Sequence, residues 1–218
     1  MNRLCVVFDL DDTLYKEIDF VESAYCAIGE RLDISAAFEV LRDAYARGVN
    51  PFETLIDRYS LLVTKEELLD VYRYHKPALN LPDSSLEVLE YLKLHNVPMG
   101  IISDGRSVTQ RNKIEALGLN SYICDKNIVI SEEFGSEKPD LRNYRYYQNL
   151  YPEIETFVYI ADNPRKDFVA PRALGWKTIG LLDDGRNIHS QSDVEDGCLP
   201  DYWIKDIIET IKIIQQYE

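Results

Sequence analysis

Short apolar runs alternate with amphipathic segments along most of the chain. Five runs rich in β-branched residues predict strands over residues 4–10, 97–103, 128–130, 157–161 and 178–182. The amphipathic segments between them predict helices over residues 85–95, 106–117, 141–150 and 166–174. Such an alternation is typical of a parallel sheet covered by helices. We therefore expect a doubly wound α/β fold.

The segment 203–217 follows the last predicted strand and carries a stripe of isoleucines at helical spacing. They are Ile204, Ile207, Ile208, Ile211 and Ile214. A stripe of this kind indicates a helix with one apolar face. We expect this helix to pack on the sheet.

The alternation is interrupted between the first and second predicted strands. Residues 15–80 contain no convincing strand, and their pattern predicts helices, for example over 20–32, 36–47 and 65–74. Pro51 punctuates the stretch, and Pro77 with Pro82 stand where the chain would return to the sheet. We expect an α/β core domain, 1–14 and 81–218, and a helical cap domain, 15–80. An insertion at this point would hang over the carboxyl ends of the strands, where open α/β sheets bind ligands.

Composition and charge narrow the classes of function. The chain has 218 residues, of which 45% are hydrophobic, and a formal net charge of −14. That charge disfavours a nucleic-acid polymer or an anionic membrane as partner, since both need clustered lysine and arginine. No run approaches the roughly 20 apolar residues of a membrane span, and no leader-like start is evident. We expect a cytoplasmic protein, monomeric or homodimeric, with its scattered cysteines reduced.

Candidate chemistry begins directly after the first predicted strand, at Asp9 and Asp11. Because alternate residues of a strand point the same way, both carboxylates can face one small volume beyond the strand end. Two carboxylates so placed repel each other unless a cation or a proton intervenes. One interpretation is a hard metal with one nucleophilic and one acid/base carboxylate. The other is an acidic loop, because aspartate is common in turns.

Further polar residues follow three other positions of the predicted fold. Ser103 and Asp104 end the second strand before a helix, so a hydroxyl and turn amides can donate to an anion there. Lys138 precedes a helix, and Asp162 with Asp167 follow the fourth strand. Each of these features taken alone is also consistent with helix capping or a solvated loop.

Taken in order, the motifs FDLDDT, IISDG, EKPD and IADNPRKD resemble the four motifs of the haloacid dehalogenase-like superfamily of phosphohydrolases. The resemblance covers the whole chain, and the helical insertion is similar to the type 1 cap of that superfamily. The opening DLDDTLY resembles its phosphatase and nucleotidase branches. The resemblance implies a Rossmann-like core and hydrolysis of a small-molecule phosphate ester.

The resemblance also implies a role for each motif residue. Asp9 would attack phosphorus, and Asp11 would protonate the leaving oxygen, its proton affinity raised by a neighbouring anion. Thr13 would hold the Asp11 side chain. The resemblance further assigns Mg²⁺ to Asp9, the Asp11 carbonyl and Asp162, an indirect supporting role to Asp167, and the phosphate oxygens to Ser103, the Asp104 amide and Lys138.

Other functions remain open on the sequence alone. Dehalogenation also uses an aspartate nucleophile, but it would leave Asp11 and Asp162 superfluous. A phosphomutase would use the same aspartyl-phosphate core, and a catalytically idle phosphate-binding protein is the alternative outside the enzymes. The physiological substrate is not readable from the cap. A late acidic stretch of residues 183–201, with His189 inside it, either covers the site or serves nothing catalytic.

Overall fold

The computed structural model describes residues 4–192 and 194–217; Asp193 of the acidic stretch and the outermost residues of the predicted core domain lie outside them. In the described part, six strands form one parallel sheet in the order β3-β2-β1-β4-β5-β6. Their bounds are β1 Leu4–Phe8, β2 Met99–Ser103, β3 Ile128–Ile130, β4 Thr156–Ala161, β5 Lys177–Leu181 and β6 Tyr202–Ile204. The chain builds outward from β1 in one direction and then, from β4, in the other. The switch point of the sheet therefore lies between β1 and β4.

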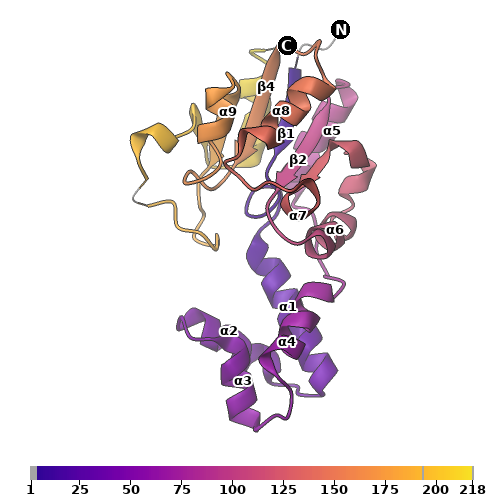
Figure 1. Cartoon of the computed structure of the whole chain (residues 1–218), viewed down its shortest axis with the longest axis vertical. Coiled ribbons are helices and arrows are strands. Elements are labelled where there is room, and N and C mark those ends of the chain that lie inside the picture. Colours follow the sequence, from indigo (N-terminus) through magenta and orange to yellow (C-terminus); the bar gives the residue numbers. More distant parts are fainter. Residues whose placement is uncertain (1–3, 193, 218) are drawn as a thin grey trace.

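Helices cover both faces of this sheet, as the doubly wound prediction requires (Figure 1). They are α5 Asp83–Leu94, α6 Ser107–Ala116, α7 Ser131–Phe134, α8 Leu141–Leu150, α9 Val169–Ala173 and α10 Thr210–Ile214. The predicted α/β fold class is confirmed. Among the described residues, no helix has the length and apolar character needed to cross a membrane.

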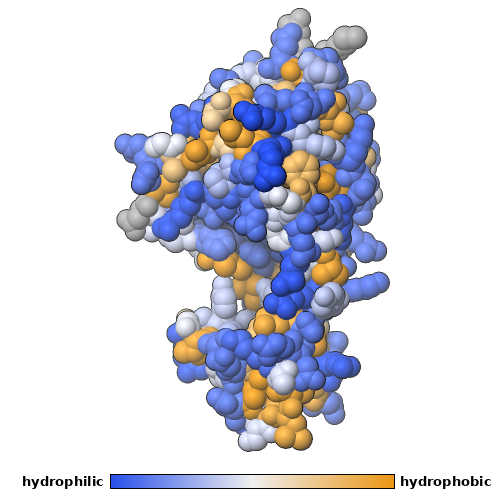
Figure 2. All heavy atoms as spheres, in the orientation of Figure 1, coloured by the Kyte–Doolittle hydropathy of each residue, from blue (hydrophilic) through white to orange (hydrophobic). Residues whose placement is uncertain are grey.

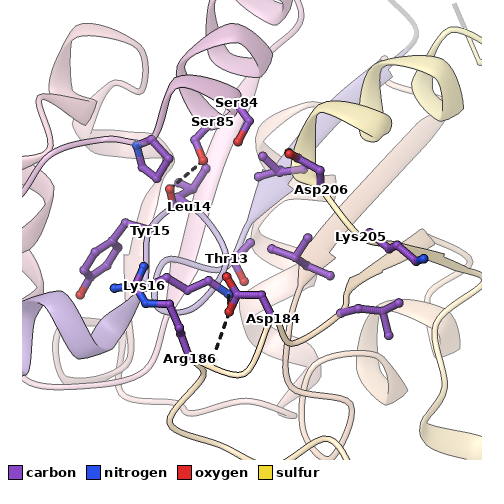
Figure 3. A pocket seen from close by; sticks show the side chains of 14 residues that line it. Thr13, Leu14, Tyr15, Lys16, Ser84, Ser85, Asp184, Arg186, Lys205 and Asp206 are labelled. Carbon is purple, nitrogen blue, oxygen red and sulfur yellow. Dashed lines mark hydrogen bonds and ion pairs between the residues drawn. The ribbon is translucent and has the colours of Figure 1, made fainter.

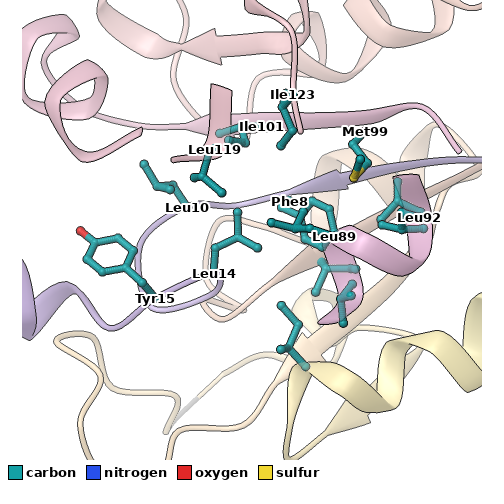
Figure 4. Packing of buried hydrophobic residues seen from close by; sticks show 14 of the residues in the cluster. Phe8, Leu10, Leu14, Tyr15, Leu89, Leu92, Met99, Ile101, Leu119 and Ile123 are labelled. Carbon is teal, nitrogen blue, oxygen red and sulfur yellow. The ribbon is translucent and has the colours of Figure 1, made fainter. Parts of the chain in front are cut away.

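Alternation along the central strand explains the two layers. Val6 and Phe8 of β1 point into one hydrophobic cluster with α5 and α10, whereas Cys5 and Val7 point into a second cluster with α8 and Trp176. Figure 4 shows Phe8, Met99 and Ile101 of the first cluster packed against Leu89 and Leu92 of α5. Because the strand is buried on both faces, its sequence is continuously apolar up to Phe8, and Asp9 is the first acidic residue beyond it.

Four helices form a separate lobe between β1 and α5. They are α1 Glu17–Leu32, α2 Ala37–Ala46, α3 Pro51–Tyr59 and α4 Lys65–Tyr74. These helices bury a third hydrophobic cluster of their own, and Figure 2 shows the lobe joined to the core by a narrower waist. Phe20 of α1 nevertheless packs into the main core cluster. The division into domains at 14/15 and 80/81 stays a prediction.

Helix α3 was not among the helices expected for the insertion. Pro51 is its first residue rather than a break, and the side chain of Asn50 accepts a hydrogen bond from the Glu53 amide at 3.1 Å. Proline suits this position because its missing N–H would have no partner there, and asparagine is a favoured cap.

The expected helix over 203–217 is wrong in its first half. Tyr202–Ile204 instead forms β6, and the α-helix is limited to Thr210–Ile214 after a 3₁₀ turn at Ile207–Glu209. The aromatic pair before Ile204 favours a strand on the open edge of β5. Gly180 makes room for it, since a Cβ there would lie 2.6 Å from the Trp203 ring. The expected packing on the sheet is present, because Ile204, Ile207 and Ile214 are buried in the main cluster.

Candidate active site

Two acids meet at the switch point of the sheet. Asp9 follows β1 and its amide donates to the Ile160 carbonyl of β4 at 2.8 Å, which fixes it beside the end of that strand. Asp162 directly follows β4. Both are buried, with exposures of 5% for Asp9 and 3% for Asp162. The parallel pairing of β1 with β4 thus brings together acids from opposite ends of the sequence.

Asp167 completes a cluster of carboxylates with these two. One oxygen from each of Asp9, Asp162 and Asp167 lies within 4.8 Å of the others. Burial and then the neighbouring charges of Asp9 and Asp167 raise the pKa of Asp162 to about 9. Burial, opposed by Lys138, raises the pKa of Asp9 to about 7. Carboxylates this close together repel one another when they are ionised. A divalent cation offsets that repulsion, and Mg²⁺ prefers oxygen ligands, so this set of oxygens suits Mg²⁺.

Lys138 is the cation already present in this cluster. Its Nζ lies 2.8 Å from Asp9 Oδ1, 2.8 Å from Asp167 Oδ1 and 3.3 Å from the Tyr159 hydroxyl, and its side chain has no exposed surface. Burial would lower the pKa of Lys138, but the charges of Asp167 and Asp9 raise it well above its ordinary value. Lys138 therefore stays charged and orients the Asp9 carboxylate.

Asp167 has both of its carboxylate oxygens occupied by the protein. One oxygen accepts from Lys138 and Tyr159, and the other accepts from the Asn163 amide at 3.1 Å. The side chain is fully buried. Asp167 can therefore position Lys138 and the turn after β4, which agrees with an indirect supporting role.

The second motif contributes the Ser103 hydroxyl and the Asp104 carboxylate. Ser103 and Asp104 line a cavity of about 100 Å³ beside Asp9 and Asp162. The Asp104 carboxylate accepts from the Lys138 amide at 3.0 Å and from Lys166 Nζ at 3.1 Å. Its side chain thus links the second, third and fourth motifs. Lys166, which the sequence analysis did not single out, adds a second cation at this cavity.

Asp11 contacts groups that the sequence analysis did not identify. Lys113 Nζ lies 2.7 Å from one of its oxygens, the Tyr15 hydroxyl donates to the same oxygen at 2.5 Å, and Gln110 donates to the other at 2.8 Å. Burial alone would raise the pKa of Asp11, but Lys113 and these hydrogen bonds outweigh it and lower the pKa. We expected a neighbouring anion to raise the proton affinity of Asp11. In this arrangement the pKa of Asp11 is lowered instead, because Lys113 lies 2.7 Å from its carboxylate.

Thr13 does not hydrogen-bond to Asp11 as expected. Its hydroxyl is buried and has no hydrogen-bond partner among the described residues. The side chain instead lines a different cavity, next to Leu14 and Ser85 (Figure 3). The holding of Asp11 that we assigned to Thr13 is performed by Lys113, Tyr15 and Gln110.

A second cavity adjoins the site between the core and the helical lobe. It has a volume of about 220 Å³ and shares Asp11, Glu17 and Asp104 with the carboxylate cavity. Aromatic and polar side chains from both lobes complete it, namely Phe20, Tyr72, Arg73, Arg106 and Thr109. This arrangement leaves room for a small group attached to a phosphate.

A sequence signal existed for part of what was missed. Lys166 stands inside the fourth motif, and Tyr15 directly follows the DLDDTL run. Lys113 gives no such signal, because a single lysine in a helix normally marks a solvated face. Only the packing of α6 against Asp11 shows that its side chain is 2% exposed.

The fold and the site place paired aspartates at the switch point of a doubly wound sheet. The family model for haloacid dehalogenase-like hydrolases matches residues 6–181. The chain belongs to this family, and the predicted phosphatase class is confirmed.

The chain is similar to several characterised proteins. It is 29% identical over 226 residues to the glyceraldehyde 3-phosphate phosphatase of Methanocaldococcus jannaschii, covering 96% of each chain. It is 28% identical over 121 residues to the pyrimidine 5′-nucleotidase YjjG of Escherichia coli, covering 55% of this chain and 50% of that one. Among solved structures, the protein YfnB of Bacillus subtilis, bound to magnesium, matches at a TM-score of 0.71 and 20% identity, covering 98% of each chain.

Proposed function

We propose that the protein is a Mg²⁺-dependent phosphatase that hydrolyses a small phosphate monoester, glyceraldehyde 3-phosphate or a compound of similar size, through an aspartyl-phosphate. The observation that carries the proposal is the convergence of Asp9 and Asp162 at one cavity, with Lys138 paired to Asp9. Relatives named as glyceraldehyde 3-phosphate phosphatases support the choice of substrate.

Asp9, Asp162 and the main-chain carbonyl of Asp11 are the groups that would hold the metal. A bound Mg²⁺ would neutralise the carboxylates and the phosphate and stabilise negative charge on the transferring group. The high pKa values of Asp9 and Asp162 support this assignment. They mean that ionising these carboxyl groups in the folded protein is unfavourable, and a bound cation would offset that free energy. The magnesium-bound structural neighbour is consistent with it.

The residues of this chain account for both halves of the reaction. The Asp9 carboxylate forms a bond to phosphorus while the bond from phosphorus to the ester oxygen breaks, and Asp11 donates a proton to the departing alcohol. Water then attacks phosphorus while Asp11 takes a proton from it, and the bond between phosphorus and the Asp9 oxygen breaks, which releases phosphate and restores the Asp9 carboxylate. Ser103, the Asp104 amide, Lys138 and Lys166 would bind the phosphate oxygens. The ionised Asp11 held by Lys113 is the form that accepts a proton from water in the second half, and that proton is the one it donates to the alcohol in the next cycle.

The dimensions of the site support a small substrate. The carboxylate cavity of about 100 Å³ suits a phosphate group, and the adjoining cavity of about 220 Å³ suits a leaving group of a few carbon atoms.

A substrate panel with metal control tests the proposal. Initial rates should be measured for glyceraldehyde 3-phosphate, other small phosphate esters, a pyrimidine 5′-nucleotide and p-nitrophenyl phosphate, each with Mg²⁺ and with EDTA. We expect turnover with Mg²⁺, loss with EDTA, and the highest kcat/KM for a three-carbon ester. Asp9→Asn should abolish turnover, while Asp43→Asn, the same change at an exposed acid of α2, should not.

Three results would contradict the proposal. Metal-independent turnover would contradict the assignment of the metal ligands. Activity in Asp9→Asn would show that another residue is the nucleophile, and a preference for the nucleotide would show that the substrate is not a three-carbon ester. Return of the phosphoryl group to another position of a sugar, without release of phosphate, would identify a mutase instead.

A further inference from the structure

The acidic segment after β5 lies against the site, which answers a question that the sequence left open. We call residues 183–192 the strap. Its core end is fixed by Gln191, whose amide donates to the carbonyls of Asp162 and Leu181, at 2.7 Å each. The strap also closes on itself, since the Asp183 amide donates to Gln191 at 2.9 Å. His189 of the strap lines the carboxylate cavity.

The strap is also tied to the root of the helical lobe. Arg186 pairs with Asp19 of α1, and Lys16, just before α1, lies 3.1 Å from Asp184. Ile188 packs against the hydrophobic cluster of the lobe. Figure 3 shows Lys16, Asp184 and Arg186 close together beside the turn that carries Thr13.

Asp12 joins the strap and the lobe at a single carboxylate. One of its oxygens accepts from the Glu17 amide at the start of α1, and the other accepts from the Ile188 amide of the strap, each at 2.9 Å. Asp12 lies in the left-handed region with φ 55°, and it is 2% exposed. The loop after β1, which carries Asp9, is therefore hydrogen-bonded through Asp12 to both the helical lobe and the strap.

Asn187 connects this assembly to the metal-site acid. Its amide nitrogen donates to Asp162 Oδ2 at 3.0 Å, and its amide oxygen accepts from Lys16 Nζ at 2.7 Å. The donor faces a carboxyl oxygen and the acceptor faces an ammonium group, so both ends of the amide have a hydrogen-bond partner. Asn187 thus holds one of the two oxygens of an acid whose carboxylate lies within 4.8 Å of those of Asp9 and Asp167.

We propose that Asn187 is a positioning residue that orients Asp162 for metal binding, and that through Lys16 it ties the metal site to the root of the helical lobe. The inference rests on the magnesium site proposed above. Hydrogen-bonding partners that orient metal ligands typically change metal affinity by about 10–100-fold when removed. Asn187 is the side chain of the strap that makes this contact, and Gln191 reaches only the main chain of Asp162.

Calorimetric titration of the full chain with Mg²⁺ alone tests the inference without any turnover. We expect Asn187→Ala to bind Mg²⁺ about 10-fold more weakly than the wild type, and Ser190→Ala, a strap change away from the site, to bind as the wild type does. Lys16→Met should weaken binding by a smaller factor. The variant with both Lys16→Met and Asn187→Ala should bind Mg²⁺ no more weakly than Asn187→Ala alone, because the two changes break the same hydrogen bond. Activity of Asn187→Ala should return towards that of the wild type as Mg²⁺ is raised, since orientation rather than chemistry was lost.

The outcomes separate this inference from the proposed function. If the wild type binds no Mg²⁺, the proposed magnesium site is wrong, and so is the role of Asn187 that depends on it. A wild type that binds Mg²⁺ and an Asn187→Ala protein that binds it equally well overturn the role of Asn187 alone. If Asn187→Ala does not fold, Lys16→Met decides in the same titration, and wild-type affinity in that variant overturns the connection to the lobe.

Discussion

Asp162→Asn should stabilise the protein in the absence of metal while abolishing its response to Mg²⁺. Burial and neighbouring acids raise the pKa of Asp162 from an ordinary 3.8 to about 9. A raised carboxyl pKa means that stability is fully present below pH 4 and is lost progressively as pH rises towards 9. At pH 7 the unfolded chain is ionised at this residue and the folded protein is not. That interval of about three pH units corresponds to about 4 kcal/mol, at about 1.4 kcal/mol per unit.

Asparagine removes this pH-dependent cost because it is neutral in both states. It also keeps an oxygen that accepts from Asn187, so the local geometry is preserved. The added amide N–H group needs a partner in the cavity, and we therefore expect a net gain of about 2–4 kcal/mol in the free energy of unfolding at pH 7. The gain should shrink towards zero near pH 4.

Urea unfolding at pH 4.5, 7 and 8, with EDTA and then with Mg²⁺, measures these quantities. At a Mg²⁺ concentration 100 times its Kd, the wild type should gain about 2.7 kcal/mol and the variant almost nothing. Asp43→Asn, an exposed change of the same kind, serves as the control. A variant that is less stable than the wild type at pH 7 without metal would refute the reasoning, as would a gain independent of pH.

Three further substitutions probe other parts of the account. Lys138→Met should lower the free energy of unfolding at pH 8 by about 3–5 kcal/mol in urea, because it leaves Asp9 and Asp167 buried and unpaired; a loss below about 1 kcal/mol would argue against the ion-pair assignment. Lys113→Met should raise the pKa of Asp11 and move the basic-side midpoint of the kcat/KM profile to higher pH, because Asp11 must carry a proton when the alcohol leaves; an unchanged midpoint would show that Asp11 is not the acid. Gly100→Ala should cost about 1–3 kcal/mol, since its Cβ would overlap the Tyr147 ring; an unaltered Tm in circular dichroism would contradict the packing.

The sheet and the motif residues were predictable because they depend on local signals. Apolar runs ending in acids placed β1 and β4 within a residue or two of their observed bounds, and parallel pairing then brought Asp9 and Asp162 together. The C-terminal stripe was harder, because isoleucine at helical spacing also suits a short strand followed by a turn. The outcome there depended on the space beside Gly180, which no local pattern encodes.

The partners of Asp11 and Asp162 were not predictable for a different reason. Lys113 lies 102 residues after Asp11, and Asn187 lies 25 residues after Asp162. Neither residue type in its own segment indicates a buried or metal-directed contact. Long-range packing decides whether such a side chain is solvated or positions an acid, and the strap becomes meaningful only when Asp12 and Lys16 are seen beside it.

The proposed mechanism requires a covalent bond between Asp9 and phosphorus, and this intermediate can be trapped. Asp11→Asn should slow hydrolysis of the intermediate, so this variant can be mixed with Mg²⁺ and ³²P-labelled p-nitrophenyl phosphate and quenched in acid within milliseconds to seconds. Borohydride reduction followed by mass spectrometry would then locate the modified residue. We expect ³²P on the protein and, after reduction, homoserine at position 9. Absence of label in a protein that still releases p-nitrophenol, or label at any other residue, would contradict it.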